Sequence, residues 1–157
     1  PVRVGLDMRL HPMVRRAAET RLIDRLPALA VGGKMAIARS ASPGILAVLR
    51  NDPTPRVIAA LLENPRLAEG LLMPLLASES ALPAVLAVIA GSPKWSVRYP
   101  IRIALCQNPR TPLDRALMLL PMLKRGDLES VAANLRLKLP LRRRAQLLAR
   151  GGGELRI

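Results

Sequence analysis

The densest group of side chains with binding chemistry is a cluster of cations near the end of the sequence. It consists of Lys138, Arg142, Arg143, Arg144 and Arg150. A guanidinium presents paired, planar N–H donors that match the oxygens of a carboxylate or a phosphate. On a helix, Arg143 and Arg150 would share one face at i and i+7, with Gln146 between them. Two interpretations are open: a surface that binds an acidic partner, or the solvated outer face that the last helix of a stack needs for solubility.

A second set of arginines follows a repeated motif. The tripeptide Asn-Pro-Arg occurs at 64–66 and at 108–110, a separation of 44 residues, and Asn134 also has an arginine two positions later. The three arginines are Arg66, Arg110 and Arg136. Self-similarity at a fixed interval is typical of repeat proteins, in which these guanidiniums would recur along one edge as a binding ladder. Alternatively, each arginine caps the carbonyls of a neighbouring helix or faces water. We expect the asparagines themselves to bond backbone groups in the turns.

The two aromatic residues lie close together in the sequence. Trp95 and Tyr99 are predicted to share one side of a helix with Arg102, at i, i+4 and i+7, and Arg98 lies beside them. Trp, Tyr and Arg are the residue types most enriched at binding hot spots. An aromatic ring at the start of a helix more often packs against the neighbouring helix. We therefore favour packing, and keep these four residues as binding candidates.

No combination of residues predicts a catalytic or metal site. His11 is the single histidine and Cys106 the single cysteine, so a His/Cys metal centre is excluded. Asp127 and Glu129 are close in sequence, but acids at the start of a helix more often complement its dipole than transfer protons. The glycine runs lack the flanking residues of a phosphate-binding loop. We therefore expect no enzyme activity, no cofactor and no small-molecule substrate.

Proline punctuates the elements that must position these residues. Three sites place a capping hydroxyl directly before a proline at the first helical position. They are Ser42-Pro43, Thr54-Pro55 and Thr111-Pro112. Between such sites the apolar residues follow helical spacing. The predicted helices are 12–26, 33–39, 43–50, 55–63, 66–77, 83–91, 96–107, 112–123, 127–134 and 140–150. The segment 135–139 alternates like a strand, but without a partner strand we expect an extended loop.

The chain carries 25 basic and 11 acidic residues, a net charge of +14, concentrated toward its two ends. Residues 1–39 hold 8 basic against 3 acidic side chains, and residues 110–157 hold 11 against 4. Such a field favours acidic proteins, nucleic acids or anionic membranes as partners. Biased codon usage in a genome also enriches arginine. The excess of arginine is therefore explained either by binding of an acidic partner or by the base composition of the genome. The last basic helix has no Trp or Phe on its apolar side, which disfavours a membrane partner.

Several features bear on where the protein resides. A single cysteine forms no internal disulfide, which favours a reducing compartment, and we expect Cys106 to be buried and inert. Charged residues interrupt the first ten positions before an apolar run develops, so we expect no secretory signal. The most apolar stretch, 70–93, contains Glu79 and two internal prolines and predicts two short buried helices, not a membrane span. We therefore expect a cytoplasmic protein. Its first residue, Pro1, leaves open a longer parent or a processed end.

One part of the chain resembles a known family. The run Leu82–Pro93, followed by Trp-Ser-Val-Arg at 95–98 and Asn-Pro-Arg-Thr-Pro at 108–112, resembles the bacterial leucine-rich repeat variant, a relative of HEAT and armadillo-like repeats. The likeness covers about residues 40–150 and is good over 82–120. It implies an all-α, right-handed solenoid that serves as an interaction scaffold. One member type of the family also carries a cysteine-bound iron–sulfur cluster, which a chain with a single cysteine does not share.

These features predict one helical-repeat domain over 1–150, with N-terminal cap helices at 12–39, repeats at 40–134, a basic C-terminal cap helix at 135–150 and a flexible tail at 151–157. An irregular helical bundle is the architectural alternative. The expected function is a non-enzymatic scaffold that docks an acidic protein or a nucleic acid on an arginine-rich face. The functional alternatives are an enzyme of the HEAT-like DNA glycosylase type, which would need a carboxylate among aromatic rings, and a structural fragment of a larger assembly. Neither the partner's identity nor the oligomeric state follows from the sequence.

Overall fold

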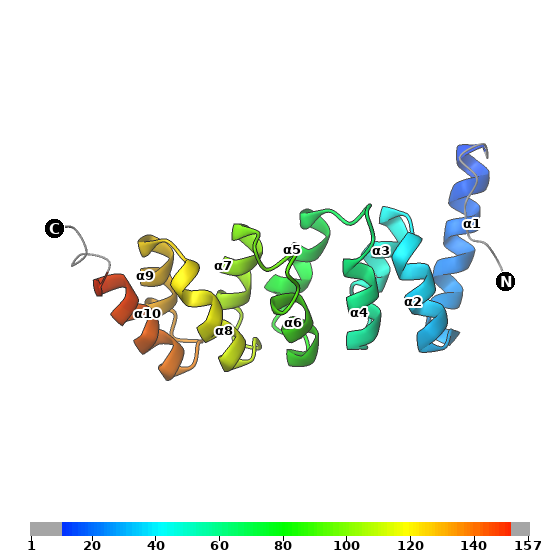
Figure 1. Ribbon diagram of the computed structural model, residues 1–157. Helices are drawn as coiled ribbons and strands as arrows, with labels where there is room; N and C mark the ends of the chain where they lie inside the picture. The colour runs from blue at the N-terminus through cyan, green and yellow to red at the C-terminus, as the bar shows by residue number, and fades with distance from the viewer. Residues whose placement is uncertain (1–10, 152–157) are drawn as a thin grey trace. The chain divides into compact units, whose positions relative to one another are not determined.

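A computed structural model describes residues 11–151 of the chain as an all-helical protein (Figure 1). These residues form ten α-helices and two 3₁₀ segments, and contain no strand. The α-helices are α1 (Pro12–Arg25), α2 (Val31–Ser40), α3 (Pro43–Leu49), α4 (Pro55–Leu62), α5 (Glu69–Ala77), α6 (Pro83–Ala90), α7 (Tyr99–Gln107), α8 (Leu113–Leu119), α9 (Arg125–Ala133) and α10 (Leu139–Gly151). The 3₁₀ segments η1 (Leu26–Ala28) and η2 (Leu120–Met122) extend α1 and α8. The all-α prediction and the prediction of about ten short helices are confirmed.

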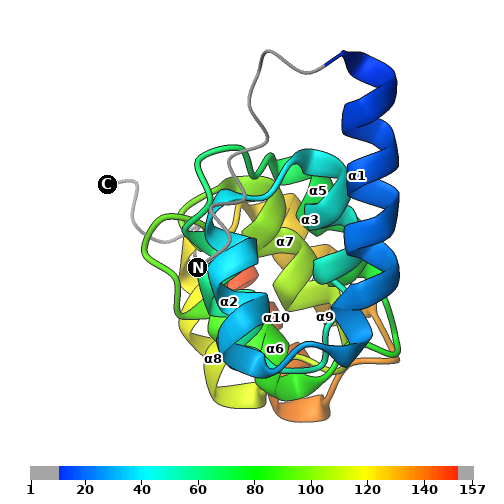
Figure 2. The ribbon, with the colours of Figure 1, turned by 90° about the vertical axis from the view of Figure 1, so that its right-hand side faces the viewer.

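Contacts along the chain divide it into two compact units, with the boundary inside α5 between Leu71 and Leu72. In unit 1, α1 packs on α3 and α2 packs on α4. Figure 2 shows α1 with α3 next to it. The core of this unit is aliphatic, with Leu46, Ile58 and Leu61 fully buried. Helices of this length are marginal alone, so burial of these aliphatic faces holds them in place.

Unit 2 has the same alternating arrangement. Helix α6 contacts α8 and α8 contacts α10, while α7 contacts α9. The helices thus form two sets, α6, α8 and α10 in one and α7 and α9 in the other. Neighbours from different sets also touch, as α7 touches α8 and α9 touches α10. Between the two sets lies a core that includes Leu86, Ile89, Ile101 and Leu105, all fully buried. The right-handed solenoid and the single domain over 1–150 remain predictions.

Proline lies at the start of half of the ten described α-helices. A proline occupies one of the first two positions of α1, α3, α4, α6 and α7, where its missing N–H has no intrahelical partner to lose. The predicted hydroxyl caps are wrong in detail. Ser42 and Thr54 occupy the N-cap positions without a side-chain cap bond, and the N-cap of α8 is Pro112, one residue after Thr111. The Ser42 and Thr111 hydroxyls are buried instead, with no hydrogen-bond partner in the described part of the chain.

Buried asparagines connect alternate helices, α2 with α4 and α5 with α7, by hydrogen bonds to main-chain carbonyls. Asn64 Nδ2 donates to Ala38 O (2.8 Å) and Ala41 O (3.1 Å), at the C-terminal end of α2. Asn108 Nδ2 donates in the same way to Leu76 O (2.7 Å) and Ser78 O (3.0 Å), at the end of α5. The last carbonyls of a helix lack intrahelical partners, and these amides supply them. The predicted structural role of the asparagines is confirmed.

The amide oxygen, Oδ1, of each asparagine side chain stabilises the turn in which that asparagine lies. Asn64 Oδ1 accepts from Arg66 N and Asn108 Oδ1 from Arg110 N, both at 2.8 Å. Asn134 repeats this bond to Arg136 N at 3.1 Å. Its Nδ2 donates to the side chain of Gln107 at 2.8 Å rather than to a carbonyl, and Asn134 is only partly buried. The bridge at Asn134 is thus a weaker variant of the other two.

Three other expectations meet the structure here. The segment 135–139 forms no strand, as expected, but it is a turn that leads into α10 at Leu139 and not the extended loop that was predicted. The apolar stretch 70–93 contains α5 and α6, and none of the helices formed by residues 11–151 has the length and apolar content needed to cross a membrane. Of the predicted tail at 151–157, Gly151 ends α10 and the remaining residues lie outside the described part of the chain.

Candidate interaction surface

Helix α10 is amphipathic, with one face against α8 and α9 and the opposite face in solvent. Leu141, Ala145 and Ala149, at i, i+4 and i+8, are buried where α10 meets α8 and α9. The two alanines have small side chains, which lets α10 approach its neighbours closely. Leu139 and Leu147 point away from that contact and are 50% and 60% exposed. We call these two residues the exposed leucine pair.

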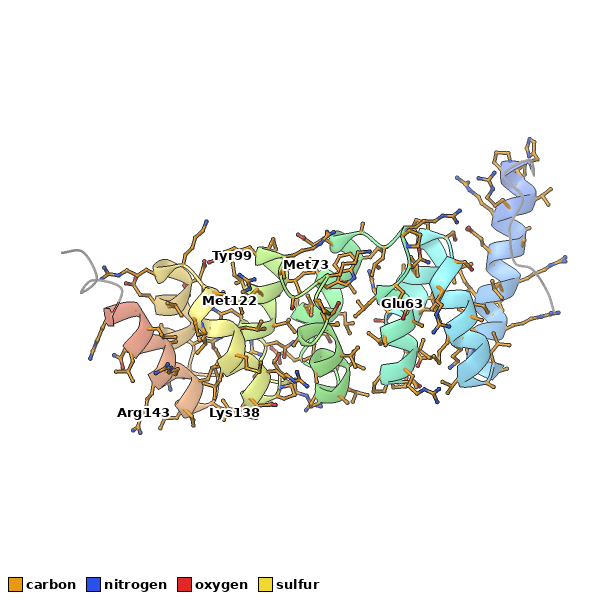
Figure 3. The ribbon with its side chains drawn as sticks, viewed as in Figure 1. Glu63, Met73, Tyr99, Met122, Lys138 and Arg143 are labelled. Atoms are coloured by element: carbon orange, nitrogen blue, oxygen red, sulfur yellow. The ribbon has the colours of Figure 1, made fainter. Side chains whose placement is uncertain are left out.

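Cations cover the exposed side of α10 and the turn before it. They are Lys138, Arg143, Arg144 and Arg150, which we call the α10 basic surface. Among residues 11–151, no acidic side chain or carbonyl accepts a hydrogen bond from these four side chains. Figure 3 shows Lys138 and Arg143 at one edge of unit 2, opposite the edge that holds Tyr99. Within the part of the chain that the structure describes, the four side chains of the α10 basic surface thus have no acceptor and can engage an external anion.

Arg142 belongs to the same predicted cluster but plays a different role. It is partly buried, and its Nε donates to Ala132 O of α9 at 3.1 Å. This bond ties α10 to α9. The predicted cluster therefore divides into four exposed cations and one arginine that braces the helix pair.

A groove of about 360 Å³ runs between α9 and α10 beside the α10 basic surface. It is lined by Arg125, Glu129, Ala132, Ala133, Gln146, Ala149 and Arg150. Arg125 and Glu129 form an i,i+4 ion pair on one wall, with Nε 3.0 Å from Oε1. Three of the seven lining residues are alanines. The groove thus combines small apolar side chains with charged ones.

The predicted arginine ladder is engaged within the protein in unit 2. Arg110 Nε donates to Ala81 O at 3.3 Å, and Arg136 pairs with Glu79. Both guanidiniums therefore reach the segment that follows α5, in part as the capping interpretation expected. Arg66 lies in unit 1, where it is exposed and its side chain makes no hydrogen bond or ion pair within the described residues. The ladder as a ligand surface remains a prediction.

Trp95 packs in the turn before α7, with the cations of Lys94 and Arg98 near its ring. Trp95 is fully buried and lies in the turn before α7, so the prediction that it shares a helix with Tyr99 and Arg102 is wrong. The guanidinium of Arg98 lies 4.3 Å from the centroid of the Trp95 ring and the Lys94 ammonium 5.3 Å from it, both within cation–π range. Packing of the aromatic ring, the favoured interpretation, agrees with this burial.

Arg102 holds the turns around Trp95. Its guanidinium donates to Ser96 O, Val97 O and Met122 O, each at 3.3 Å. Three of its five N–H groups are thus bonded to backbone of the protein itself. Arg102 stays a predicted binding residue, with fewer donors to offer than the α10 basic surface.

Tyr99 links α7 to the start of α9. Its hydroxyl donates to Asp127 Oδ2 at 2.6 Å and accepts from Lys124 N at 2.7 Å. Burial and the bond to the Asp127 carboxylate raise the pKa of Tyr99 above 10.0. The Lys124 ammonium lies 5.1 Å from the centroid of the Tyr99 ring. Asp127 lies in the first turn of α9, where the dipole interpretation placed it. Its carboxylate accepts the hydrogen bond from the Tyr99 hydroxyl.

Sequence reasoning missed two features. One is the exposed leucine pair. The other is an ion pair in unit 1 between Lys34 Nζ and Asp52 Oδ2, at 2.8 Å, with side chains 16% and 8% exposed. Burial alone would raise the pKa of Asp52, but hydrogen bonds from Lys34 and Thr54 lower it by more, so the pKa lies below 3.8. The Asp52-Pro53-Thr54 turn was the available signal, since Asp52 Oδ1 also accepts from Thr54 N.

Cys106 and His11 have local partners. Cys106 is fully buried, as predicted, its Sγ donates to Ala116 O at 3.8 Å, and burial raises the pKa of its thiol to about 12. His11 Nδ1 accepts from Met13 N at the start of α1. Residues 11–151 contain no group of three or more His, Cys, Asp or Glu side chains placed to share a metal ion.

Comparisons with protein-family models, with curated proteins and with solved structures found no match to this chain. The likeness to leucine-rich repeat variants therefore remains a prediction from the motifs. The features that bear on function are the charges and exposed side chains described above.

Proposed function

We propose that this chain is a non-enzymatic helical interaction module that docks an acidic protein through the α10 basic surface. The observation that carries the proposal is the contrast between this surface and the other arginines of unit 2. Arg102, Arg110 and Arg142 donate to backbone carbonyls, and Arg136 meets Glu79. The four cations of the α10 basic surface have no such partner among residues 11–151. An acidic partner would supply the carboxylates that residues 11–151 do not offer to this surface.

The composition of the surface favours a protein over a nucleic acid. Proteins that grip single strands stack bases on exposed aromatic rings. Here Trp95 is fully buried and the Tyr99 hydroxyl is bonded to Asp127. The exposed leucine pair lies among the cations instead. Apolar side chains next to guanidiniums are the composition expected of a protein–protein contact.

The packing of the helices supports a scaffold role. In each unit, alternate helices contact one another, α1 with α3 in unit 1 and α6 with α8 in unit 2. This alternation agrees with the proposed repeat stack, in which a helix contacts only its neighbours and presents its outer face to partners. On this proposal α10 offers its solvent-facing side for binding while α8 and α9 hold its other side.

The test is a charge reversal with a matched control. The variant is Arg143→Glu/Arg150→Glu, and the control is Arg16→Glu/Arg21→Glu, two exposed arginines of α1 that give the same change in net charge. Binding of fluorescein-labelled poly-glutamate is followed by fluorescence anisotropy over a salt series. We expect the variant to bind about tenfold more weakly, which corresponds to about 1.4 kcal/mol for two lost ion pairs. The control should stay within about twofold, because it makes the same change in net charge and leaves the α10 basic surface intact.

Two outcomes would overturn the proposal. One is equal weakening by the variant and the control, which would mean that net charge alone attracts the polymer. The other is tighter binding of a DNA duplex than of poly-glutamate, lost selectively in Arg143→Glu/Arg150→Glu. The α10 basic surface would then serve nucleic acid, and log K should fall with log salt at a slope of about −0.9 for each phosphate neutralised.

A further inference from the structure

The outer face of α10 alternates leucine and arginine along the helix. Leu139, Arg143 and Leu147 follow one another at i, i+4 and i+8, and Arg150 lies one turn after Leu147. Side chains at this spacing lie above one another on one face of a helix. All four are exposed. The face thus presents a leucine, a cation, a second leucine and a second cation in order.

This face is unusual for a helix whose only task is to be soluble. A solvent-facing helix needs a polar outer side, because a large apolar patch there invites association. A lone exposed leucine needs no explanation. Two half-exposed leucines on one face, with a cation between them, form a continuous surface that is both apolar and positively charged.

The α9–α10 groove widens this surface. Arg150 and Gln146 belong to both the groove wall and the exposed side of α10. Ala132, Ala133 and Ala149 contribute apolar methyl groups to the groove lining. A side chain that enters the groove would therefore meet apolar carbon as well as the Arg150 side chain.

We infer, building on the proposed function, that the acidic partner binds the outer face of α10 as an amphipathic helix. Leu139 and Leu147 are eight residues apart, which is about 12 Å along a helix axis. A partner helix repeats its apolar residues over the same two turns, at i and i+7 or i+8. Carboxylates beside its apolar stripe then fall opposite Arg143 and Arg150. Helix-in-groove binding of this kind is a common mode of recognition.

Charge selects this occupant over a second copy of the chain. The chain carries a net charge of +14, and the face itself bears only cations. Two such faces pressed together would bring guanidiniums of like sign into contact, which is unfavourable. An acidic helix satisfies the leucines and the cations at once. Charge complementarity and apolar spacing therefore point to the same partner.

The test compares two synthetic peptides of equal composition. One is a helical peptide of about three heptads with leucine at two positions of each heptad and glutamate at most others. The other is its scrambled form, which has the same charge and no apolar stripe. We expect the wild-type protein to bind the amphipathic peptide about tenfold more tightly than the scrambled one. The readout is fluorescence anisotropy, with peptide helicity followed by far-UV circular dichroism.

Surface variants assign the preference to the leucine pair. Leu139→Gln/Leu147→Gln should abolish the preference and still bind poly-glutamate, because the α10 basic surface is intact. The control Val97→Gln/Met118→Gln removes two other exposed apolar side chains of unit 2 and should keep the preference. All four positions are half exposed or more, so the thermal midpoint of each variant should stay close to that of the parent.

The outcomes separate this inference from the proposed function. Equal binding of the two peptides, together with loss of poly-glutamate binding in Arg143→Glu/Arg150→Glu, would refute the amphipathic helix and leave the acidic partner in place. If Arg143→Glu/Arg150→Glu still bound poly-glutamate as tightly as the parent and the peptide preference was also unchanged, the proposed function would be refuted. Concentration-dependent dimerisation of the protein alone, abolished by Leu139→Gln/Leu147→Gln, would show that a second copy occupies the face and would overturn the inference.

Discussion

The asparagine bridges permit a graded prediction of stability. Asn108 is buried and makes three hydrogen bonds, to Leu76 O, Ser78 O and Arg110 N. Asn108→Ala removes all three and leaves two carbonyls and one N–H without their partner. At about 1 kcal/mol net for each bond, the free energy of unfolding should fall by about 3 kcal/mol. With a urea dependence of about 2 kcal/mol/M, the midpoint should move down by about 1.5 M.

The same accounting ranks the three asparagines. Asn64→Ala loses the equivalent three bonds in unit 1 and should cost a similar amount. Asn134→Ala loses two bonds at a partly exposed site, one of them to the Gln107 side chain, and should cost about 1 kcal/mol. Asn108→Asp keeps the acceptor but turns a carboxylate oxygen toward two carbonyls, and should cost more than the alanine variant at neutral pH.

The assay is urea denaturation followed by far-UV circular dichroism and by the fluorescence of Trp95, which is buried in the same unit as Asn108. The control is Asn51→Ala, at an exposed asparagine whose side chain makes no hydrogen bond within the described residues. If Asn108→Ala unfolds at the urea concentration of Asn51→Ala, or if Asn134→Ala costs as much as Asn108→Ala, the bridges do not hold the helix ends together.

Three further predictions concern titratable groups. Asp52→Asn should destabilise the protein at neutral pH, which would appear as a lower urea midpoint than that of the parent. Because the folded pKa of Asp52 lies below 3.8, the difference between the two midpoints should be complete above pH 3.8. It should vanish as the pH falls through the lower folded pKa. Cys106, with its pKa raised to about 12, should react with a disulfide reagent at mildly alkaline pH only after urea unfolds the protein, and fast reaction of the folded protein would contradict its burial. Tyr99, whose pKa lies above 10.0, should develop phenolate absorbance at a lower pH in Asp127→Asn than in the parent, and an unchanged titration would show that the bond to Asp127 is not formed.

The helices were predictable from sequence because proline marks their starts without reference to tertiary structure. Pro43, Pro55 and Pro83 each begin a helix at the predicted residue. Proline fixes its own φ and has no N–H to donate, so it fits the first turn in any surroundings. Nine of the ten described α-helices end within one residue of the prediction, and α8 ends at Leu119, four residues before the predicted end, where the 3₁₀ segment η2 takes over.

The turn before α7 was not predictable from spacing. The predicted helix began at 96, but α7 begins at Tyr99. The apolar spacing from Trp95 onward fits a helix, yet Ser96 and Val97 direct their carbonyls to the Arg102 guanidinium instead. Such side chain–backbone bonds compete with helical ones and come from the local three-dimensional arrangement.

The candidate surface was predictable in its charges and not in its apolar part. Lys138 and Arg143 stood out in the sequence as part of a cationic cluster. Helix α10 has leucines at several positions around its axis, and periodicity does not tell which of them meet a neighbour. Leu141 is buried while Leu139 and Leu147 are half exposed, a difference set by the positions of α8 and α9. Likewise, the engagement of Arg110 with Ala81 depends on a contact 29 residues apart.

The asparagine bridges also bear on how the chain matures during synthesis. Each bridge joins an asparagine to a partner that precedes it, 26 residues back for the Asn64 bond to Ala38 and 32 for the Asn108 bond to Leu76. A ribosome releases the partner first, so each link can close once its asparagine has emerged. The separations of 26 and 32 residues each span a small part of the 157-residue chain, so neither link waits for the rest of the chain. Newly made helices can therefore be secured one after another from the N-terminal end, without waiting for the α10 basic surface to be translated.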